Sequence, residues 1–333
     1  QTHYSALDEI NRGNVKQLTK AWSFDTGDAF PDSEMQVNPI VIDRTMFIVS
    51  PRLRVFALDA GTGKELWRFD PMEGRKSPNS KKRSRGLTYW TDGRQQRLFF
   101  AARQYLYAID AKTGRLDAAF GQGGKVDLRE GLERDPKFLS VASNTPGMIY
   151  KDLLILGSTG FTPGHVRAYD VRTGKIAWTF HTIPKPGQVG HDTWPADGWA
   201  RANGANAWAG MALDEKRGLV FIPTASGGMG DKDFYGADRK GDNLFVSSIV
   251  AVDANTGEYK WHFQTTPRDN WDYTATQPII LAELPLGENG AARRVVMQAP
   301  KNGFFYVLDA KTGQYISGKA YVPQTWTTGL DAK

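Results

Sequence analysis

The sequence predicts an all-β fold, a propeller made of four-stranded blades. One hairpin pattern recurs along the chain: an apolar strand that ends in Asp, a turn that ends in Thr-Gly, and a return strand. Its copies are 39 to 60 residues apart, the length of one blade, and they contain Asp59, Asp110, Asp170, Asp253 and Asp309, with a degenerate sixth copy at Asp214. Helical periodicity is confined to residues 7–20, so no helical layer is expected.

Each hairpin has a local reason to form. The Asp side chain can accept backbone N–H groups of the turn, and the Gly supplies the positive φ that the turn needs. Trp67, Trp178 and Trp261 occupy the same place on three return strands. A large flat side chain at this place can wedge between neighbouring blades, so we expect packing residues there rather than ligand contacts.

The whole chain, residues 1–333, is expected to form one propeller domain. Its length exceeds the roughly 250–300 residues that one ordinary core supports, which favours a repetitive array. Residues 1–20 are expected to be a short helical or irregular segment. Residues 20–24 have the pattern of an outer strand without the rest of its blade, so we expect a partial ring.

Charge and composition exclude several classes of function. The net charge is +6, and much of the excess lies in a basic run at residues 75–85, which we expect to be a solvated loop or to face an anionic ligand or lipid surface. No recognition helix accompanies it, so nucleic acid is not expected. The chain has no Cys, which removes disulfides, thiolate metal sites and Cys-x-x-Cys-His haem attachment. Its apolar runs are far shorter than the ~20 residues of a membrane span.

Two further segments carry a family resemblance. Together with the hairpins, Asp269-Asn270-Trp271-Asp272-Tyr273 and Lys301-Asn302-Gly303, which continues to Asp309, resemble the pyrroloquinoline quinone (PQQ) dependent dehydrogenases. The resemblance covers essentially the whole chain and implies about six blades of an eight-bladed quinoprotein propeller with the quinone on its axis. Lys301 and the absence of Cys are similar to the membrane-type glucose and polyol dehydrogenase branch.

The resemblance implies two catalytic residues. Asp272 would be the base that takes the substrate's hydroxyl proton, and Lys301 would stabilise charge on the quinone oxygens and so also bind the cofactor. For Asp272 the alternative is a turn residue bonded to backbone, a role that also suits Asp269. For Lys301 the alternative is a solvated side chain before a turn.

The resemblance also implies a cofactor site. Trp208 would be the floor under the planar ring, with core packing as the alternative, and Trp90 would be an aromatic lid. Arg85 would pair with a carboxylate of PQQ. The remaining implied residues line the edge of the cofactor, with ordinary strand-end residues as the alternative, and are Ser143, Thr159 and Gly160.

The resemblance further implies a calcium ion at the site. The family's Ca²⁺ acts as a Lewis acid and takes oxygen ligands. Asp272 would be the one anionic ligand, while Thr162 and Ser226 stand where the alcohol-oxidising branch has Glu and Asn. The five histidines show no metal spacing, although His191 could reach a substrate.

The expected function is oxidation of a sugar, polyol or other alcohol by hydride transfer to PQQ. Electrons would pass to a separate acceptor, a membrane quinone or a cytochrome, and by analogy the protein would be periplasmic. Residues 184–200 and 227–242 are expected to be specificity loops above the axis. The alternatives are a non-catalytic propeller acting as an interaction or assembly scaffold and a sugar-binding propeller.

Overall fold

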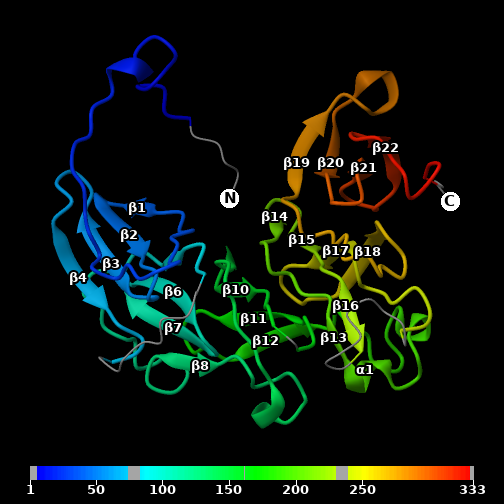
Figure 1. Cartoon of the computed structure of the whole chain (residues 1–333), viewed down its shortest axis with the longest axis horizontal. Helices are drawn as coiled ribbons and strands as arrows, with labels where there is room; N and C mark the ends of the chain where they lie inside the picture. The colour runs from blue at the N-terminus through cyan, green and yellow to red at the C-terminus, as the bar shows by residue number, and fades with distance from the viewer. Residues whose placement is uncertain (1–5, 74–82, 161, 230–238, 331–333) are drawn as a thin grey trace.

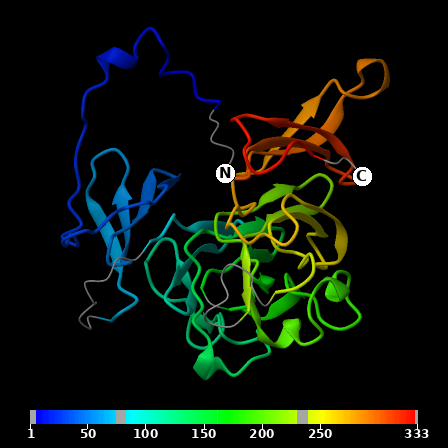
Figure 2. The same ribbon diagram turned by 45° about the vertical axis from the view of Figure 1, so that its right-hand side comes forward.

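The computed structural model describes residues 6–73, 83–160, 162–229 and 239–330. These residues form five antiparallel four-stranded sheets and one two-stranded ribbon. The sheets follow one another around an open arc in chain order (Figure 1). The view turned by 45° again places the first and the last sheet at the two ends of the arc (Figure 2). The predicted all-β propeller architecture is confirmed.

Four consecutive strands form most of the sheets. The first contains β1 (Ile40–Ile42), β2 (Thr45–Val49), β3 (Val55–Asp59) and β4 (Glu65–Phe69); the second, β5 (Thr88–Thr91), β6 (Gln96–Ala102), β7 (Tyr105–Asp110) and β8 (Lys125–Asp127); the third, β9 (Met148–Tyr150), β10 (Leu153–Leu156), β11 (Val166–Asp170) and β12 (Ile176–Phe180). The fourth contains β14 (Ala212–Asp214), β15 (Leu219–Pro223), β17 (Ser248–Asp253) and β18 (Tyr259–Gln264); the fifth, β19 (Ile280–Leu284), β20 (Arg293–Gln298), β21 (Phe304–Asp309) and β22 (Tyr315–Ala320). The ribbon pairs β13 (Ala202–Gly204) with β16 (Gly227–Met229).

Helical structure in the described residues is limited to short turns. They are the helix α1 (Gly198–Arg201) and the 3-10 turns Val15–Gln17, Pro136–Phe138, His191–Thr193 and Glu288–Gly290. The predicted short helical or irregular segment at the N-terminus is thus a single turn as far as it is described. Across the described ranges, we find no helix with the length and apolar character that a membrane crossing requires.

The degenerate hairpin copy is not a blade of its own. Asp214 ends β14 and Asp253 ends β17, and Leu219 of β15 pairs with both. The two Asp residues therefore belong to one sheet, because two strands of this sheet run toward the same end. The estimate of about six blades counted this sheet twice.

Each regular hairpin turn is closed by its own Asp. At the first, Asp59 Oδ1 accepts the N–H groups of Gly61 and Thr62 at 3.1 and 2.8 Å and the Thr62 hydroxyl at 2.8 Å. The Thr62 hydroxyl and N–H bonds lower the pKa of Asp59. The same three-donor pattern recurs at Asp110, Asp170 and Asp309.

The repeated tryptophans pack against the next hairpin, as predicted. Trp67 donates its indole N–H to Ala111 O at 3.2 Å, and a Cβ on Gly114 would lie 2.6 Å from this indole ring. The pattern also holds for Trp178 with Ala254, Trp261 with Ala310 and, before the first sheet, Trp22 with Ala60. Residues 20–24 are not a regular strand, yet Trp22 packs as an outer-strand tryptophan does.

The junction between the second and third sheets uses a different side chain. No tryptophan caps Gly174, which instead faces Val126 and Phe120. The carbonyl of Val171, which corresponds to Ala111 O in the other junctions, accepts from the guanidinium of Arg97. This guanidinium is almost fully buried and pairs with Asp117 at 2.6 Å. A cation therefore takes over the hydrogen bond that indoles make elsewhere.

Strand direction separates the functional loops from the repeated turns. Because neighbouring strands are antiparallel, the Asp-Thr-Gly turns lie at one end of each sheet, here called the hairpin end. Each loop between the second and third strands lies at the opposite end, with the connections to the next sheet. This opposite end, here called the site end, contains the loops 157–165, 181–211, 224–247, 265–279 and 299–303.

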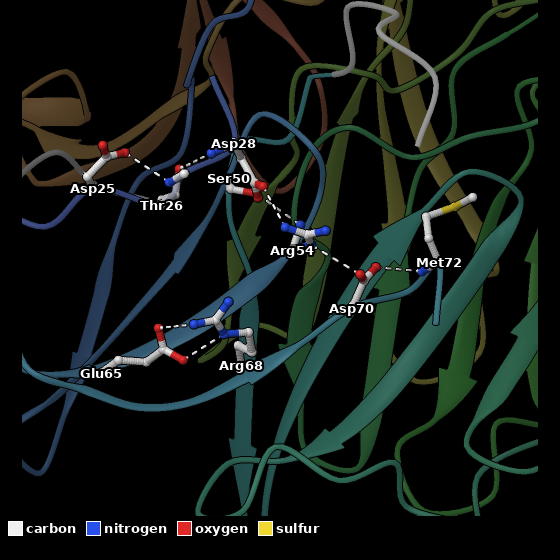
Figure 3. A network of polar contacts seen from close by, with 10 residues as sticks. Asp25, Thr26, Asp28, Ser50, Arg54, Glu65, Arg68, Asp70 and Met72 are labelled. Carbon is white, nitrogen blue, oxygen red and sulfur yellow. Dashed lines mark hydrogen bonds and ion pairs between the residues drawn. The ribbon is translucent and has the colours of Figure 1, made fainter. Parts of the chain in front are cut away.

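A polar network fixes the chain at the site end of the first sheet (Figure 3). The buried Asp28 accepts the Ser50 hydroxyl at 2.5 Å and pairs with Arg54 at 2.7 Å. Arg54 also contacts Asp70 at 3.1 Å, and Asp70 accepts the N–H of Met72. The network ties the segment before β1 and the start of the connection after β4 to the loop between β2 and β3.

Candidate functional site

A cavity of about 340 Å³ lies at the site end of the third, fourth and fifth sheets. Each of the five loops of the site end contributes to it, so its walls come from segments far apart in the sequence. Six predicted site residues line it, namely Thr159, Gly160, Trp208, Ser226, Asp272 and Lys301; the other lining residues are Asn203, Gly204, Asn206, Ala225, Gly227 and Thr274.

Asp272 lies between a hydroxyl and an ammonium group. Ser226 donates its hydroxyl to Asp272 Oδ1 at 2.6 Å, and Lys301 Nζ is 3.5 Å from Oδ2. The side chains of Asp272 and Lys301 are 37% and 50% exposed, so their pairing contributes at most about 1 kcal/mol to stability. The geometry leaves this carboxylate accessible from the cavity, as a general base must be.

The loop that presents Asp272 has an unusual backbone. Asp272 and Thr274 have φ values of 56° and 50°, in the left-handed region that non-glycine residues rarely adopt. Asp269 is 1% exposed and accepts backbone N–H groups of this loop. The turn role considered for Asp269 is therefore confirmed.

Trp208 lines the cavity, and Arg85 contacts the Trp208 ring from outside the cavity lining. Both are half-buried, and the Arg85 guanidinium carbon lies 5.5 Å from the centre of the Trp208 ring. Burial, with a smaller contribution from Arg83, lowers the pKa of Arg85. Within the described ranges this guanidinium makes no hydrogen bond or salt bridge, although the charge of Glu34 acts on it and opposes the lowering of its pKa. A desolvated guanidinium that stacks on an indole suits a planar ligand with carboxylates.

The predicted edge residues lie on two adjoining segments. Ala142 and Thr159 exchange backbone hydrogen bonds of 3.1 and 2.8 Å, which places Ser143 beside the cavity wall. Ser143 donates to Thr145 O at 3.2 Å and lines a small neighbouring space rather than the cavity. Gly160 is required at its position, because a Cβ there would lie 2.2 Å from Ser140 O.

Trp90 is not a lid, contrary to the prediction. It is 4% exposed in β5 and packs in the core between the second and third sheets. The guanidinium groups of Arg97 and Arg172 lie 5.8 and 4.8 Å from its ring. Because Trp90 lies in β5, its side chain enters the junction between the second and third sheets, where the outer strand has no tryptophan. It therefore points away from the cavity.

Two other predicted residues also lie outside the cavity lining. Thr162 is fully buried, and its hydroxyl finds no hydrogen-bond partner among the described residues. His191 Nδ1 lies 3.2 Å from Pro184 O instead of facing a substrate position. Within the described parts of the chain, no three His, Cys, Asp or Glu side chains gather in a way that could hold a metal ion.

The expected loops contribute unequally. None of residues 184–200 lines the cavity, whereas Gly227, at the start of 227–242, does. Residues 230–238 lie outside the described part, as do residues 75–82 of the basic run. Arg83, from the same run, pairs with Glu34 at 2.6 Å.

Sequence reasoning missed three polar lining residues, Asn203, Asn206 and Thr274. Asn206 is two residues before Trp208, and Thr274 is two residues after Asp272. Their proximity to recognised site residues was the available signal. The backbone carbonyl of Asn206 accepts the N–H of Ala225 at 3.0 Å, and this bond joins two cavity loops.

Comparison with known proteins agrees with this geometry. The family model described as "PQQ: Glucose/ethanol/alcohol dehydrogenase, beta-propeller domain" matches residues 1–328. The chain therefore belongs to the PQQ-dependent dehydrogenase family of β-propellers, as the sequence predicted. PQQ, normally together with Ca²⁺, is the cofactor of this family.

Particular relatives narrow the comparison. The chain is 38% identical to the quinohemoprotein alcohol dehydrogenase ADH-IIG of Pseudomonas putida, over 100% of this chain and 46% of the relative. It is 37% identical to the dehydrogenase subunit of alcohol dehydrogenase (quinone) of Komagataeibacter europaeus, again over 100% of this chain and 46% of that protein. The chain thus spans about half the length of these relatives.

Solved structures show the same fold. The quinohemoprotein alcohol dehydrogenase of Comamonas testosteroni matches 99% of this chain and 49% of its own, with a TM-score of 0.82 and 32% identity. A europium-containing methanol dehydrogenase matches 98% of this chain and 57% of its own, with a TM-score of 0.79 and 27% identity.

Proposed function

We propose that this protein is part of a PQQ-dependent dehydrogenase that oxidises an alcohol, with Asp272 as the catalytic base. The observation that carries the proposal is the accessible carboxylate of Asp272, held between Ser226 at 2.6 Å and Lys301 at 3.5 Å in a cavity with an indole wall. A carboxylate that a hydroxyl and an ammonium group hold in place at the cavity can take the proton of a substrate hydroxyl.

The residues present fit PQQ. The half-buried Arg85, which stacks on Trp208 and makes no salt bridge among the described residues, suits a planar tricarboxylate. Trp208 would hold the ring face, while Thr159 and Gly160 would hold its edge, with Ser143 behind them. Lys301 would stabilise negative charge at the quinone end. When bound, PQQ supplies the acceptor for the hydride of the alcohol carbon.

The oxygen donors also fit a calcium ion, with a low ligand charge. Asp272 and Ser226 are in contact, and the buried Thr162 hydroxyl lacks a partner among the described residues. Asp272 and Ser226 would hold Ca²⁺ with a single carboxylate, whereas Thr162 lies outside the cavity lining. Since ligand charge sets calcium affinity, we expect weaker binding than in a site with two carboxylates.

We propose an alcohol rather than a sugar as substrate. The relatives described above are alcohol dehydrogenases by name, and this similarity outweighs the argument for a glucose or polyol enzyme from Lys301 and the missing Cys. The names of relatives include quinone and cytochrome c, so we propose a membrane quinone or a cytochrome as electron acceptor and a periplasmic location.

A non-catalytic scaffold is not favoured. A scaffold has no need for a carboxylate and an ammonium group in one cavity with a half-buried guanidinium behind its indole, since such groups cost desolvation energy without a ligand. The sugar-binding alternative likewise gives no reason for a base beside Lys301.

The test is dye-linked oxidation of primary alcohols, polyols and aldoses after addition of PQQ and Ca²⁺. Asp272→Asn is expected to lower kcat by about 10²–10⁴-fold with PQQ binding retained, because a positioned base contributes that much. Asp197→Asn, at an exposed carboxylate paired with Arg201 outside the cavity, is the matched control. Full activity of the Asp272 variant would contradict the proposed base, and no PQQ binding by the unchanged protein would contradict the function.

A further inference from the structure

Asp269 is a buried carboxylate whose two oxygens each take two hydrogen bonds. Oδ1 accepts the N–H groups of Trp271 and Tyr273 at 3.0 and 3.1 Å. Oδ2 accepts the N–H of Thr274 at 3.0 Å and the hydroxyl of Ser247 at 2.5 Å. The side chain is thus fully used by neutral donors and does not face the cavity, so it is not a second base.

The chain from residue 269 to residue 274 wraps around this carboxylate. Three of the five N–H groups that follow Asp269 point inward to it, while the side chain of Asp272 points outward to Ser226 and Lys301. The left-handed backbone of Asp272 and Thr274 costs energy, and it persists only where the surroundings determine it. The Asp269 carboxylate, which accepts three N–H groups of this segment, holds the backbone in that conformation.

Residues 269–274 are also attached to loop 224–247, which joins β15 to β17 in the fourth sheet. Ser247, which lies at the end of that loop, provides one of the four donors. The fully buried Arg239 donates to Asp269 O at 2.6 Å and to Asn243 Oδ1 at 3.0 Å, while Arg268 N–H donates to Asp242 O. The same loop carries Ser226 at its beginning, so one loop holds Asp272 from both sides.

We propose that Asp269 is a positioning residue for Asp272, and that the Ser247 hydroxyl holds Asp269 in place. This inference rests on the proposed function of Asp272. An Asn at position 269 keeps one acceptor oxygen for the Trp271 and Tyr273 N–H groups. Its NH₂ group cannot accept the N–H of Thr274, so the contact that holds the end of segment 269–274 is lost.

The experiment compares variants of the PQQ-loaded protein in steady-state alcohol oxidation. Asp269→Asn is expected to lower kcat by about 10–100-fold with KM and PQQ affinity within about twofold, because misplacing a reacting group by about 1 Å costs this much rate. Ser247→Ala is expected to lower kcat by about 2–5-fold, since it removes one of the four donors. For both, the isotope effect with alcohol deuterated at the reacting carbon rises, because the chemical step becomes more rate-limiting.

The matched control is Asp170→Asn at the hairpin end of the third sheet. Asp170 also accepts two backbone N–H groups and one hydroxyl, but none of its donors lines the cavity. Asp170→Asn is expected to leave kcat and the isotope effect unchanged. An equal loss of kcat in this control would overturn the proposal, since it would indicate a general effect of lost stability.

Asp272→Asn distinguishes failure of the positioning role of Asp269 from failure of the proposed base. If it is inactive while both Asp269→Asn and Ser247→Ala keep the kcat of the unchanged protein, the positioning role is wrong and the base stands. If Asp272→Asn is fully active, the proposed function itself fails. Should Asp269→Asn not fold, Ser247→Ala decides, because it only removes a hydroxyl: a lowered kcat with a raised isotope effect supports the proposal, and an unchanged kcat overturns it.

Discussion

The two ends of the same sheets follow different rules. At the hairpin end, each turn is closed by its own Asp and Thr and covered by a side chain of the preceding sheet, so the same few contacts recur around the arc. At the site end, five loops from different parts of the sequence each contribute side chains to one cavity, and no repeated motif marks these residues. Local sequence determines the first end, while assembly of the sheets determines the second.

The largest expected effect would sharpen this contrast at the site end. Lys301→Ala removes the ammonium group beside Asp272 and is expected to lower kcat by about 10²–10³-fold, the usual cost of losing one charge-stabilising donor. Its melting temperature should stay close to that of the unchanged protein, since both partners of the pair are largely exposed. Calorimetry together with dye-linked kinetics checks the prediction. A large loss of stability would contradict the view that side chains of the site end serve activity rather than folding.

The reverse behaviour is expected at the hairpin end. Gly114→Ala places a Cβ 2.6 Å from the Trp67 ring at a backbone φ of 72°, so it should destabilise the fold by about 2–4 kcal/mol, from left-handed strain and overpacking together. The kcat of the remaining folded protein should not change.

Gly93→Ala is the control for that prediction. Gly93 also has a positive φ, 87°, but nothing lies within 4 Å of its Cβ position. Only the conformational cost of about 1 kcal/mol is expected there. Equal destabilisation in urea unfolding would show that the tryptophan contact is unimportant.

The two ends should also lose stability in different ranges of pH. At the site end, burial lowers the pKa of His165 well below its usual 6.5, so the unfolded chain binds a proton that the folded one does not. Stability should therefore fall as pH drops below about 6.5, by up to about 1.4 kcal/mol per pH unit.

The hairpin end responds only in acid. The pKa values of Asp59, Asp170 and Asp309 lie below the usual 3.8, so their stabilisation is present above that pH and is lost as pH falls through the lowered values. His165→Gln should reduce the slope of unfolding free energy against pH between pH 7 and 5, measured in urea, without changing the acid limb below about pH 4; His181 and His262, whose pKa values burial also lowers, account for the remaining slope. An unchanged slope between pH 7 and 5 would exclude His165 as its source.

The smallest effect concerns a surface pair of the first sheet. Arg68 and Glu65 lie 2.7 Å apart on β4, with the Arg68 side chain 56% exposed. Arg68→Ala should therefore change unfolding free energy by no more than about 0.5 kcal/mol. A larger change would indicate that this pair has a role beyond the surface.

Much of the hairpin end could be predicted because its signals are local. Asp, Thr, Gly and Trp occur at fixed offsets, and their contacts are made within a turn or with the next turn. The one miscount, at Asp214, arose because two strands of the fourth sheet end in Asp at the same end. Local pattern does not tell whether two such strands share a sheet.

The site could be predicted only where a family motif exists. Asp272, Lys301 and Trp208 stand in recognisable segments, and the structure brings them to one cavity. Trp90 was misplaced because the family resemblance implied a lid over the cofactor, whereas its strand position directs it into a junction between sheets. Asn203, in the short strand β13, and Thr274, in an irregular loop, were missed because neither stands in a repeated pattern of the sequence.

The replacement of an indole by Arg97 gives one junction of the arc a sensitivity to ionic strength. The tryptophan junctions are held by neutral groups, whereas the guanidinium of Arg97 depends on Asp117, whose side chain is 24% exposed and so accessible to counter-ions. Added salt weakens such a pair and leaves the indole contacts unchanged. We expect hydrogen exchange at high salt to quicken first at Gly121, whose N–H crosses this junction to Thr173 O. Equal exchange at all junctions would show that salt does not act through Arg97.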